Sequence, residues 1–490
     1  MRAAPVLLAL LLGCGSGEAP TPAPEPTPAP APVLPDARPV IPGSEPYAPP
    51  IPAQLELPPF AAARVLERPT LDLVSVRVVV PRGAADDPGD DWGVAALTAE
   101  MMEQGAGDMD GFALSLAAER LGADIAVVAR RDYSLATLDV VASQLGPALR
   151  LLADVVLRPR FDADEWERTK GLWLEDLAAR AFEPRSVAGV AGDVALYGSG
   201  HGYGRPVDGF LQSVRGLKRE DVVAFHRSAW RVDDATFVAV GKVTAAGLRK
   251  AVAEAFSDVP LPDGPRSAQG SPRAPTKAWG RFVIVDRPKS PQTVLRLAWP
   301  GPTMDADDRA PLDLVDFVLG GSFTSRLNSN LREDKGYTYG ARSRLPTTRG
   351  AGAFVAGAAV QAEVTGKAMK ELLAELEGIA KTGPTVEETA KARASLRNDD
   401  VQAYETVAGA ADRVALLAGL GLPARFDADH AAARSRQTPE AVAEAARFFF
   451  PDRALVVAVG DKAAILEQLA EEGIDLGEPR MSDAEGDPAK

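Results

Sequence analysis

The residue types that hold zinc or attack a substrate are scarce in this chain of 490 residues, which contains three histidines and one cysteine. His201 lies in the sequence His-Gly-Tyr-Gly-Arg-Pro, whereas His226 and His430 fall in two separate helical patterns. Catalytic zinc sites use three protein ligands, and zinc prefers imidazole and thiolate donors. We therefore expect each histidine to have a surface or structural role, and an autonomous zinc hydrolase is disfavoured.

The segment from Gly93 to Gly105 has the frame of a zinc site without its ligands. It resembles the zinc helix of the insulinase (pitrilysin) metallopeptidases, roughly Gly-x-Ala-His-x-x-Glu-His-x-x-x-x-Gly. In such a helix the two imidazoles share one face and hold zinc, while the glutamate activates its water. Here Ala96 stands at the first His, Ala99 at the Glu and Glu100 at the second His. The resemblance implies that the chain does not cut peptides with a zinc of its own.

The family's third zinc ligand, a glutamate on another helix, is matched here by Asp176. Thr169, seven residues earlier, replaces an acidic residue that the family usually has. Every expected site position has changed, yet the spacing between them is kept. Glu100 and Asp176 are two carboxylates without an imidazole, which is a poor zinc site. We expect no metal and no other cofactor in this chain.

The segment from Gly320 to Tyr339 carries the clearest family resemblance. It contains Ser-Arg-Leu at 325–327, Leu-Arg-Glu at 331–333 and Gly-x-x-Tyr at 336–339. These runs resemble the substrate-facing half of the family. The adjacent glycines 320 and 321 would let the backbone bend, and Arg326 is assigned to structure.

Arg332 and Tyr339 match an Arg and a Tyr that, in active family members, point across a chamber at the zinc site. Attack on an amide places negative charge on the carbonyl oxygen, and a guanidinium and a phenol can donate hydrogen bonds to it. The structural alternative is that Arg332 pairs with the neighbouring Glu333 or Asp334 while Tyr339 packs on a strand. In two-chain members one subunit carries the zinc helix and the other supplies this pair, and the chain resembles the second kind.

The elements that would position these residues occur twice. A strand-like run at 235–241 recurs at 454–460, and the terminal glycines are 219 residues apart. The run at 73–80, followed by Asp86-Asp87, echoes 294–299 followed by Asp307-Asp308, at an offset of 221. Matching offsets at both ends of a unit indicate internal duplication.

Long helical patterns separate these strand-like runs, at residues 109–121, 144–156, 163–181 and 386–396. Helices mixed with strands in this way predict an α+β fold with helices packed over a sheet. Together with the resemblance, this gives two homologous insulinase-like domains, each a mostly antiparallel sheet with packed helices, arranged as a clam shell. The predicted segments are a lipoprotein signal peptide with lipobox (1–14), a Pro/Ala-rich linker (15–60), an N-terminal domain with the degenerate zinc motif (61–262), a linker (263–277), a C-terminal domain with the Arg/Tyr pair (278–476) and a polar tail (477–490).

The single cysteine, Cys14, follows a positive start and a short apolar run, and Leu11-Leu12-Gly13-Cys14 resembles a bacterial lipobox. An ordinary secretory signal with an incidental cysteine is the alternative. Gly15 after the cysteine favours the outer membrane, so we expect a lipid-anchored protein of the bacterial cell envelope that faces the periplasm. The Pro/Ala-rich stretch that follows cannot bury a core and is interpreted as a tether; a ligand for a proline-recognising module is the other interpretation.

Bulk properties exclude several classes. The net charge of −14 argues against nucleic acid and against an anionic membrane surface as partners. The sequence has no apolar run long enough for a transmembrane helix, and one cysteine excludes an internal disulfide framework. The membrane is expected to be reached only through lipid on Cys14.

The sequence therefore favours a noncatalytic, substrate-facing subunit of a heteromeric zinc peptidase that degrades peptides. Its expected partner is a zinc-bearing insulinase-family homologue, in a heterodimer or larger assembly. The alternative is a peptide-binding or scaffold protein of the cell envelope with no role in cleavage. A neighbouring gene for a homologue with an intact zinc helix would favour the first hypothesis.

Overall fold

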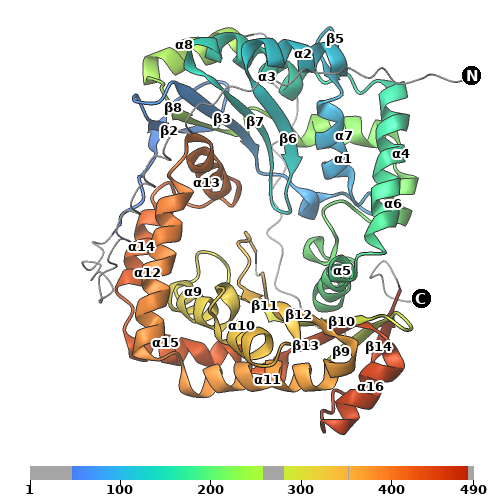
Figure 1. Ribbon diagram of the computed structural model, residues 1–490. Helices are drawn as coiled ribbons and strands as arrows, with labels where there is room; N and C mark the ends of the chain where they lie inside the picture. Colours follow the sequence, from blue (N-terminus) through green and yellow to red (C-terminus); the bar gives the residue numbers. More distant parts are fainter. Residues whose placement is uncertain (1–46, 258–280, 351, 484–490) are drawn as a thin grey trace, which may run out of the picture. The chain divides into compact units, whose positions relative to one another are not determined.

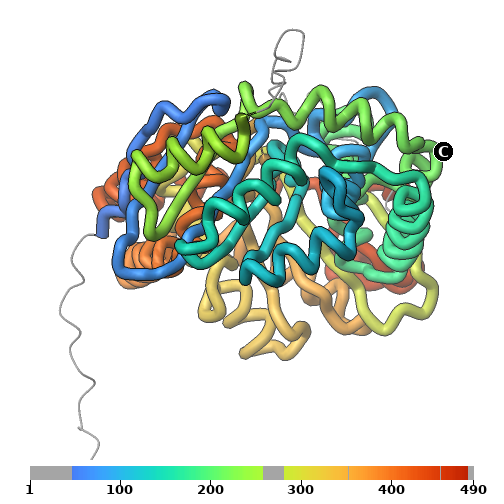
Figure 2. Tube along the Cα trace, turned by 90° about the horizontal axis from the view of Figure 1, so that it is seen from above, coloured from blue at the N-terminus to red at the C-terminus, as the bar shows by residue number. Residues whose placement is uncertain are grey.

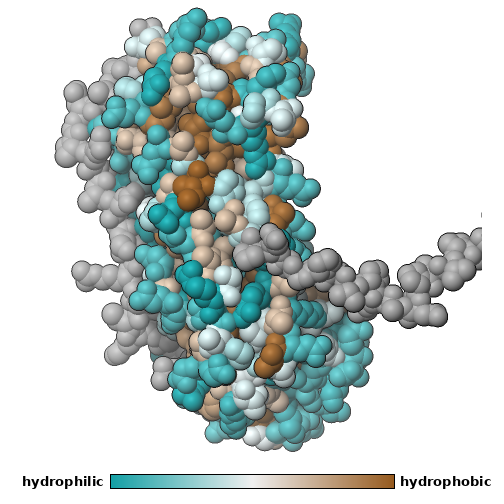
Figure 3. Space-filling model, turned by 90° about the vertical axis from the view of Figure 1, so that its left-hand side faces the viewer, coloured by the Kyte–Doolittle hydropathy of each residue, from teal (hydrophilic) through white to brown (hydrophobic). Residues whose placement is uncertain are grey.

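The computed structural model describes residues 47–257, 281–350 and 352–483. Cys14, the lipobox and the predicted linker at 263–277 lie outside these residues. Among the described helices, none combines the length and apolarity needed to cross a membrane. The face in Figure 3 mixes hydrophilic and hydrophobic residues, with the hydrophobic ones gathered mainly in its upper part.

Residues 47–257 form an N-terminal domain around a six-stranded sheet with the order β1-β2-β8-β3-β7-β6 (Figure 1). All neighbouring pairs are antiparallel except β2 and β8, which run parallel. The strands are β1 (Ala53–Leu55), β2 (Ala62–Glu67), β3 (Leu73–Val80), β6 (Asp124–Ala129), β7 (Ser134–Val141) and β8 (Thr236–Gly241); β4 (Gly105–Ala106) and β5 (Met109–Asp110) form a separate hairpin.

Residues 281–483 form a C-terminal domain around a second six-stranded sheet with the order β11-β12-β10-β13-β9-β14. The pairs β13-β9 and β9-β14 are parallel, and the other three are antiparallel. The strands are β9 (Phe282–Asp286), β10 (Gln292–Pro300), β11 (Thr338–Arg344), β12 (Ala353–Gln361), β13 (Leu455–Gly460) and β14 (Arg480–Ser482). The predicted α+β class with two homologous, mostly antiparallel domains is confirmed.

Each sheet buries one face under helices of its own domain, as Figure 2 shows from above for the N-terminal domain. The N-terminal helices are α1 (Val94–Met102), α2 (Gly111–Leu121), α3 (Leu145–Leu157), α4 (Ala163–Arg180), α5 (Pro184–Tyr197), α6 (Leu211–Gly216), α7 (Arg219–Ala229) and α8 (Ala245–Ala255). The C-terminal helices are α9 (Arg309–Asp316), α10 (Arg326–Asn328), α11 (Thr365–Thr382), α12 (Val386–Ala403), α13 (Val407–Gly419), α14 (Phe426–Ser435), α15 (Pro439–Ala445) and α16 (Lys462–Glu471).

The other face of each sheet is covered by a helix from the opposite domain. Helix α13 packs on β3 and β8, and helix α5 packs on β10 and β13. Both helices present small or β-branched residues to the sheet, such as Ala188 and Ala191 in α5 and Ala410 and Val414 in α13. Such side chains let helix and sheet approach closely. The duplicated halves have therefore exchanged equivalent helices, and neither sheet is fully covered without the other half.

Two predicted boundaries are wrong because short strands lack a strong sequence signal. The Pro/Ala-rich linker was placed at 15–60, but β1 pairs with β2 and the nearby Leu57 and Phe60 are buried in the domain core. The polar tail was placed at 477–490, but β14 pairs with β9. Both strands have three residues and lie at sheet edges, where polar side chains and flanking prolines are tolerated.

Candidate functional site

Helix α1 occupies the frame of the predicted zinc helix. It begins after Gly93, whose φ of 95° lies in the left-handed region that favours glycine. The carboxylate of Asp87 accepts hydrogen bonds from the backbone N–H groups of Gly93 at 2.7 Å and Ala95 at 3.1 Å. Burial raises the pKa of Asp87 to about 7. The start of α1 is thus fixed by a buried carboxyl group instead of by any ligand.

The predicted zinc-site positions carry no metal-binding arrangement. Ala96 and Ala99 are buried in the domain core, Glu100 is half-buried, and Asp176 is exposed on α4. Within the described residues, no group of three or more His, Cys, Asp or Glu side chains could hold a metal ion. Alanine offers no donor atom, so the residues present at the frame do not fit a zinc ion.

Where α1 meets α4, a chain of side-chain hydrogen bonds connects the two helices. Gln104 Nε2 donates to Glu100 Oε1 at 3.4 Å, and Arg168 Nη2 donates to Gln104 Oε1 at 2.6 Å. Arg168 also pairs with Glu165 at 2.7 Å. Arg168 brings positive charge to a junction where a cation would have to bind, which further disfavours a divalent metal.

Each of the three histidines has a structural partner, as expected. His201 Nδ1 accepts a hydrogen bond from the backbone N–H of Tyr203 at 3.0 Å. His226 Nε2 lies 2.9 Å from the carbonyl oxygen of Val156, and burial lowers the pKa of His226 to about 4. His430 Nε2 lies 2.7 Å from a carboxylate oxygen of Asp313. The three rings do not converge on one site.

Arg332 and Tyr339 are separated by a tight turn. Arg332 lies in a π-helical segment, Ser329–Asp334, and Tyr339 is the second residue of β11. Between them Gly336 adopts a φ of 66°, and its N–H donates to the Arg332 carbonyl oxygen at 3.1 Å. A non-glycine residue here would be strained in the left-handed region. The turn explains how two residues seven apart in the sequence reach the same cavity.

A bulge in β11 and two polar side chains hold this segment in place. The register between β11 and β12 shifts between Thr338 and Ala341, which is where bulges re-aim side chains. Thr338 Oγ1 donates to the Ala359 carbonyl oxygen at 2.6 Å. Asn328 Oδ1 accepts the Ala341 N–H at 2.9 Å, which links the helical segment to the strand. The Tyr339 ring is left 91% exposed.

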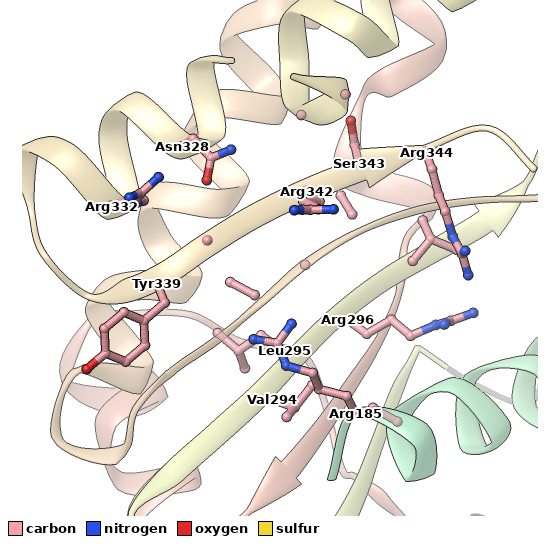
Figure 4. Close-up of a pocket in the computed structure, with 18 of the residues that line it drawn as sticks. Arg185, Val294, Leu295, Arg296, Asn328, Arg332, Tyr339, Arg342, Ser343 and Arg344 are labelled. Atoms are coloured by element: carbon pink, nitrogen blue, oxygen red, sulfur yellow. The ribbon is translucent and has the colours of Figure 1, made fainter. Parts of the chain in front are cut away.

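Both residues line one cavity of about 590 Å³ in the C-terminal domain (Figure 4). The guanidinium of Arg332 lies 4.3 Å from the centroid of the exposed Phe323 ring and 3.5 Å from Glu333. The pairing with Glu333 was the structural alternative, and it coexists with access to the cavity because the Arg332 side chain remains about one-third exposed. Tyr339 does not pack on the strand, and its hydroxyl is free to donate.

Arg326 belongs to the same segment but does not face this cavity. It makes a bidentate ion pair with Glu388, at 2.8 and 2.6 Å, and donates to the Gly383 carbonyl oxygen at 3.2 Å. The hydrogen bond from Arg326 lowers the pKa of Glu388 to about 2. Arg326 therefore joins α10 to the start of α12, as a structural residue would.

Two sequence patterns of known peptidases match the chain. That of the insulinase family (peptidase family M16) matches residues 64–189, which include α1 and Asp176. That of the peptidase M16 inactive domain matches residues 216–396, which include Arg332 and Tyr339. The chain belongs to the insulinase family.

Three proteins with known sequences or structures are similar to this chain. An uncharacterized zinc protease of Mycobacterium tuberculosis is 29% identical over 344 residues, which cover 69% of this chain and 76% of that protein. The peptidase M16 inactive domain from Pseudomonas fluorescens is 26% identical with a TM-score of 0.77, covering 84% of this chain and 98% of that one. A chain of complex III from Candida albicans, 14% identical and with a TM-score of 0.69, covers 86% and 97% and shares the fold.

Sequence reasoning missed several residues of this insulinase-family cavity. Arg342 and Arg344 stand two residues apart in β11, and this period of two could have placed them on one face of a strand. Arg185 and Arg296 also line the cavity, but they come from α5 and β10. No local pattern brings those two together, because the contact depends on the exchange of α5 between the domains.

Proposed function

We propose that this chain is a noncatalytic, substrate-facing subunit of a heteromeric insulinase-family zinc peptidase. In this proposal it supplies Arg332 and Tyr339 to the zinc site of a homologous partner chain. The observation that carries the proposal is the contrast between two sites. The metal frame of α1 holds Ala96 and Ala99, whereas Arg332 and Tyr339 share an accessible cavity, where Arg332 makes one 3.5 Å ion pair with Glu333 and keeps its side chain about one-third exposed.

The chemistry assigned to this chain is hydrogen-bond donation. When a peptide carbonyl is attacked, its oxygen gains negative charge, and the Tyr339 hydroxyl and the Arg332 guanidinium would donate to it. Donors that are fixed before the reaction stabilise such charge without reorganising. The turn at Gly336 and the bulge of β11 supply that rigidity. Arg332 can also hold a substrate carbonyl before the reaction, so it would contribute to binding as well.

The partnership rests on the missing ligands and on family precedent. A chain that retains the donor pair but lacks zinc ligands needs a second chain to complete a peptidase site. The relative from Mycobacterium tuberculosis is named a zinc protease, and the chain of Candida albicans complex III belongs to a multi-subunit assembly. A heterodimer or larger assembly with a zinc-bearing homologue is therefore the arrangement that we propose.

The test uses the reconstituted pair, with Tyr339→Phe in this subunit. The variant removes one donor and keeps the ring, so turnover should fall about 100-fold, or about 3 kcal/mol, as for other oxyanion donors. Assembly, measured by size-exclusion chromatography, should be unchanged. Tyr337→Phe is the matched control, because Tyr337 lies two residues away and does not line the cavity.

If Tyr339→Phe leaves turnover within about twofold in a fully assembled complex, the completing-subunit mechanism fails. The chain would then be better described by the second hypothesis, a peptide-binding or scaffold protein with no role in cleavage. Peptide binding by the isolated chain, without any change in the partner's activity, would support that alternative.

We also propose that the protein is anchored through lipid on Cys14 in the bacterial cell envelope, at the outer membrane facing the periplasm. The lipobox-like sequence and the following Pro/Ala-rich stretch support this location. Metabolic labelling with a fatty-acid analogue tests it: the full chain should take up label, and the Cys14→Ser variant should not. Equal labelling of both would show that Cys14 is not the anchor.

A further inference from the structure

The cavity that contains Arg332 and Tyr339 is lined by five arginines: Arg185, Arg296, Arg332, Arg342 and Arg344. Among the described residues, no aspartate, glutamate or lysine lines it. The whole chain has a net charge of −14, so this concentration of positive charge runs against its overall composition. At physiological salt, charges are screened beyond about 8 Å, so the local arginines determine the potential inside the cavity.

Two of these arginines lie in one row across the sheet. In the register of the three strands, Arg296 of β10 is opposite Gly357 of β12, and Gly357 is opposite Arg342 of β11. A Cβ at Gly357 would lie 2.2 Å from the Leu295 carbonyl oxygen, so no side chain can stand between the arginines. Arg344 projects from the same face two residues further along β11. The floor of the cavity is therefore cationic and open.

Helix α5 of the N-terminal domain closes one side of the cavity with Arg185 and Ala188, and Figure 4 shows Arg185 reaching over the strands. Two glycines of α5 make room for Arg296. An added Cβ would lie 2.7 Å from Arg296 Nε at Gly192 and 3.7 Å from its Nη1 at Gly189. The Arg296 guanidinium is thus packed against a helix while it still borders the cavity.

The positive charge of the cavity is only partly balanced. Arg296 pairs with Asp193 at 2.7 Å, but Asp193 also binds Arg131 at 3.0 Å. The Nε atom of Arg296 is buried without a hydrogen-bond partner. In the described part of the chain, the side chains of Arg185, Arg342 and Arg344 make no hydrogen bond or ion pair. Leaving the buried Nε of Arg296 without an acceptor is costly, and the three exposed guanidinium groups have donors to spare, so a ligand that supplies acceptors is favoured.

We propose that this cavity binds acidic polypeptide segments, whose aspartate and glutamate carboxylates pair with the arginines of the floor. Guanidinium groups match carboxylates in bidentate geometry and bind them more strongly than neutral acceptors do. The inference rests on the proposed function in one respect, because it takes this cavity as the place where substrate lies beside Arg332 and Tyr339. It adds the substrate class, which is peptides rich in carboxylates.

The rest of the lining favours a peptide over other anions. The exposed rings of Phe323 and Tyr339 offer apolar contact, while Asn328, Ser322 and Ser343 are polar neighbours. A cavity of about 590 Å³ has the size of a ligand pocket and would be filled only in part by a phosphate ion. A concave site also cannot lie flat against a bilayer. An extended peptide with alternating side chains would use both the rings and the arginines.

Binding is tested on the isolated full chain, so no partner is needed. The probe is a fluorescently labelled peptide rich in glutamate, and the comparison peptide replaces each glutamate with glutamine. Fluorescence anisotropy should show at least about tenfold tighter binding of the glutamate peptide, with the advantage shrinking as salt is raised. Equal affinity for the two peptides would overturn the inference.

The variants separate the cavity from general charge effects. The double variant Arg342→Gln/Arg344→Gln should weaken binding of the glutamate peptide at least about tenfold. The control Arg436→Gln/Arg447→Gln removes two exposed arginines outside the cavity and should stay within twofold. Arg342 and Arg344 are exposed and unpaired, so the double variant should keep its melting temperature. Unchanged binding by a folded double variant contradicts the proposal.

Competition with inorganic pyrophosphate distinguishes the source of the anion. Displacement of the peptide only at pyrophosphate concentrations well above the peptide's own dissociation constant supports a peptide site, whereas displacement at lower concentrations would make it a phosphate site.

The result of these binding experiments is independent of the turnover test. Loss of turnover in Tyr339→Phe without selective peptide binding would reject only this inference, and selective binding without loss of turnover would reject only the completing-subunit mechanism.

Discussion

The two sheets carry an arginine at equivalent positions of β3 and β10, yet the residues around these two arginines differ in charge. Arg77 of β3 and Arg296 of β10 are 219 residues apart, which is the offset of the duplication. Each pairs with an aspartate on the exchanged helix: Arg77 binds Asp412 of α13, and Arg296 binds Asp193 of α5, both at 2.7 Å. The aspartates are also 219 residues apart. The duplication thus retained an ion pair that joins each sheet to the opposite domain.

The balance of positive and negative charge around Arg77 differs from that around Arg296. Arg77 is 2% exposed and also binds Asp139 of β7 through Nη1 at 3.0 Å and Nη2 at 3.2 Å. Burial opposes its charge, but the two aspartates outweigh that effect and raise the pKa of Arg77. In the second sheet the register places Ala359 where Asp139 would be. Burial, reinforced by the charges of Arg344 and Arg131, lowers the pKa of Arg296.

The edge strands beside the two arginines, β6 and β11, also differ in charge. On β6, Ala126 and Val128 lie in register with the part of β7 that is next to Arg77. On β11 the corresponding residues are Arg342 and Arg344. One half therefore closes its sheet under α13 with an arginine whose charge is more than balanced by two aspartates. The other leaves several positive charges beside a cavity. The same fold position serves structure in the first half and is available for a ligand in the second.

The largest expected loss of stability at neutral pH comes from removing Arg77. Arg77→Met would remove the buried cation that Asp139 and Asp412 both bind. Because these carboxylates are 36% and 61% exposed, water can hydrate them in its place, and unfolding by urea should show a loss of about 2–3 kcal/mol. Arg296→Met should cost less than about 1 kcal/mol, because Asp193 keeps Arg131 as a partner. Similar losses in both variants would show that the two sites are not different in the way described.

One buried group in each half, His226 and Asp316, should respond to pH in opposite directions. His226 in the N-terminal domain has its pKa lowered by burial from 6.5 to about 4, so its contribution to stability is present above pH 6.5 and lost as the pH falls toward 4. Burial raises the pKa of Asp316, next to the cavity segment, from 3.8 to about 7. Its contribution is present below pH 3.8 and lost as the pH rises toward 7.

The difference between wild type and a variant that cannot titrate isolates each group. Between pH 4 and 6.5, His226→Gln should remove a pH dependence of about 3 kcal/mol from the unfolding free energy. Asp316→Asn should remove a dependence of about 3–4 kcal/mol and of opposite sign between pH 4 and 7, and it keeps an acceptor for the Ser343 hydroxyl, which lies 2.6 Å away. Slopes of the same sign would contradict the burial of one of the two groups.

The sequence predicted the duplication and the fold class. The strands at 73–80, 236–241 and 455–460 agree with the predicted runs because buried β-branched residues give a strong local signal. Ala96 and Ala99 were identifiable because the frame around them is a local pattern on one helix. The short edge strands β1 and β14 were missed because three residues with polar neighbours give almost no periodicity.

By itself, then, the sequence determined what depends on neighbours along the chain: where the long buried strands lie, that the elements occur twice, and that α1 carries no histidine. The tertiary structure alone decided that α5 and α13 exchange partners, that Arg185 and Arg296 meet the arginines of β11, and that Arg77 is neutralised while Arg296 is not. The physical reason is that electrostatic balance depends on distances in space. Asp139 lies diagonal to Arg77 and Ala359 lies diagonal to Arg296, and this equivalence can be read only from the register of the folded sheets.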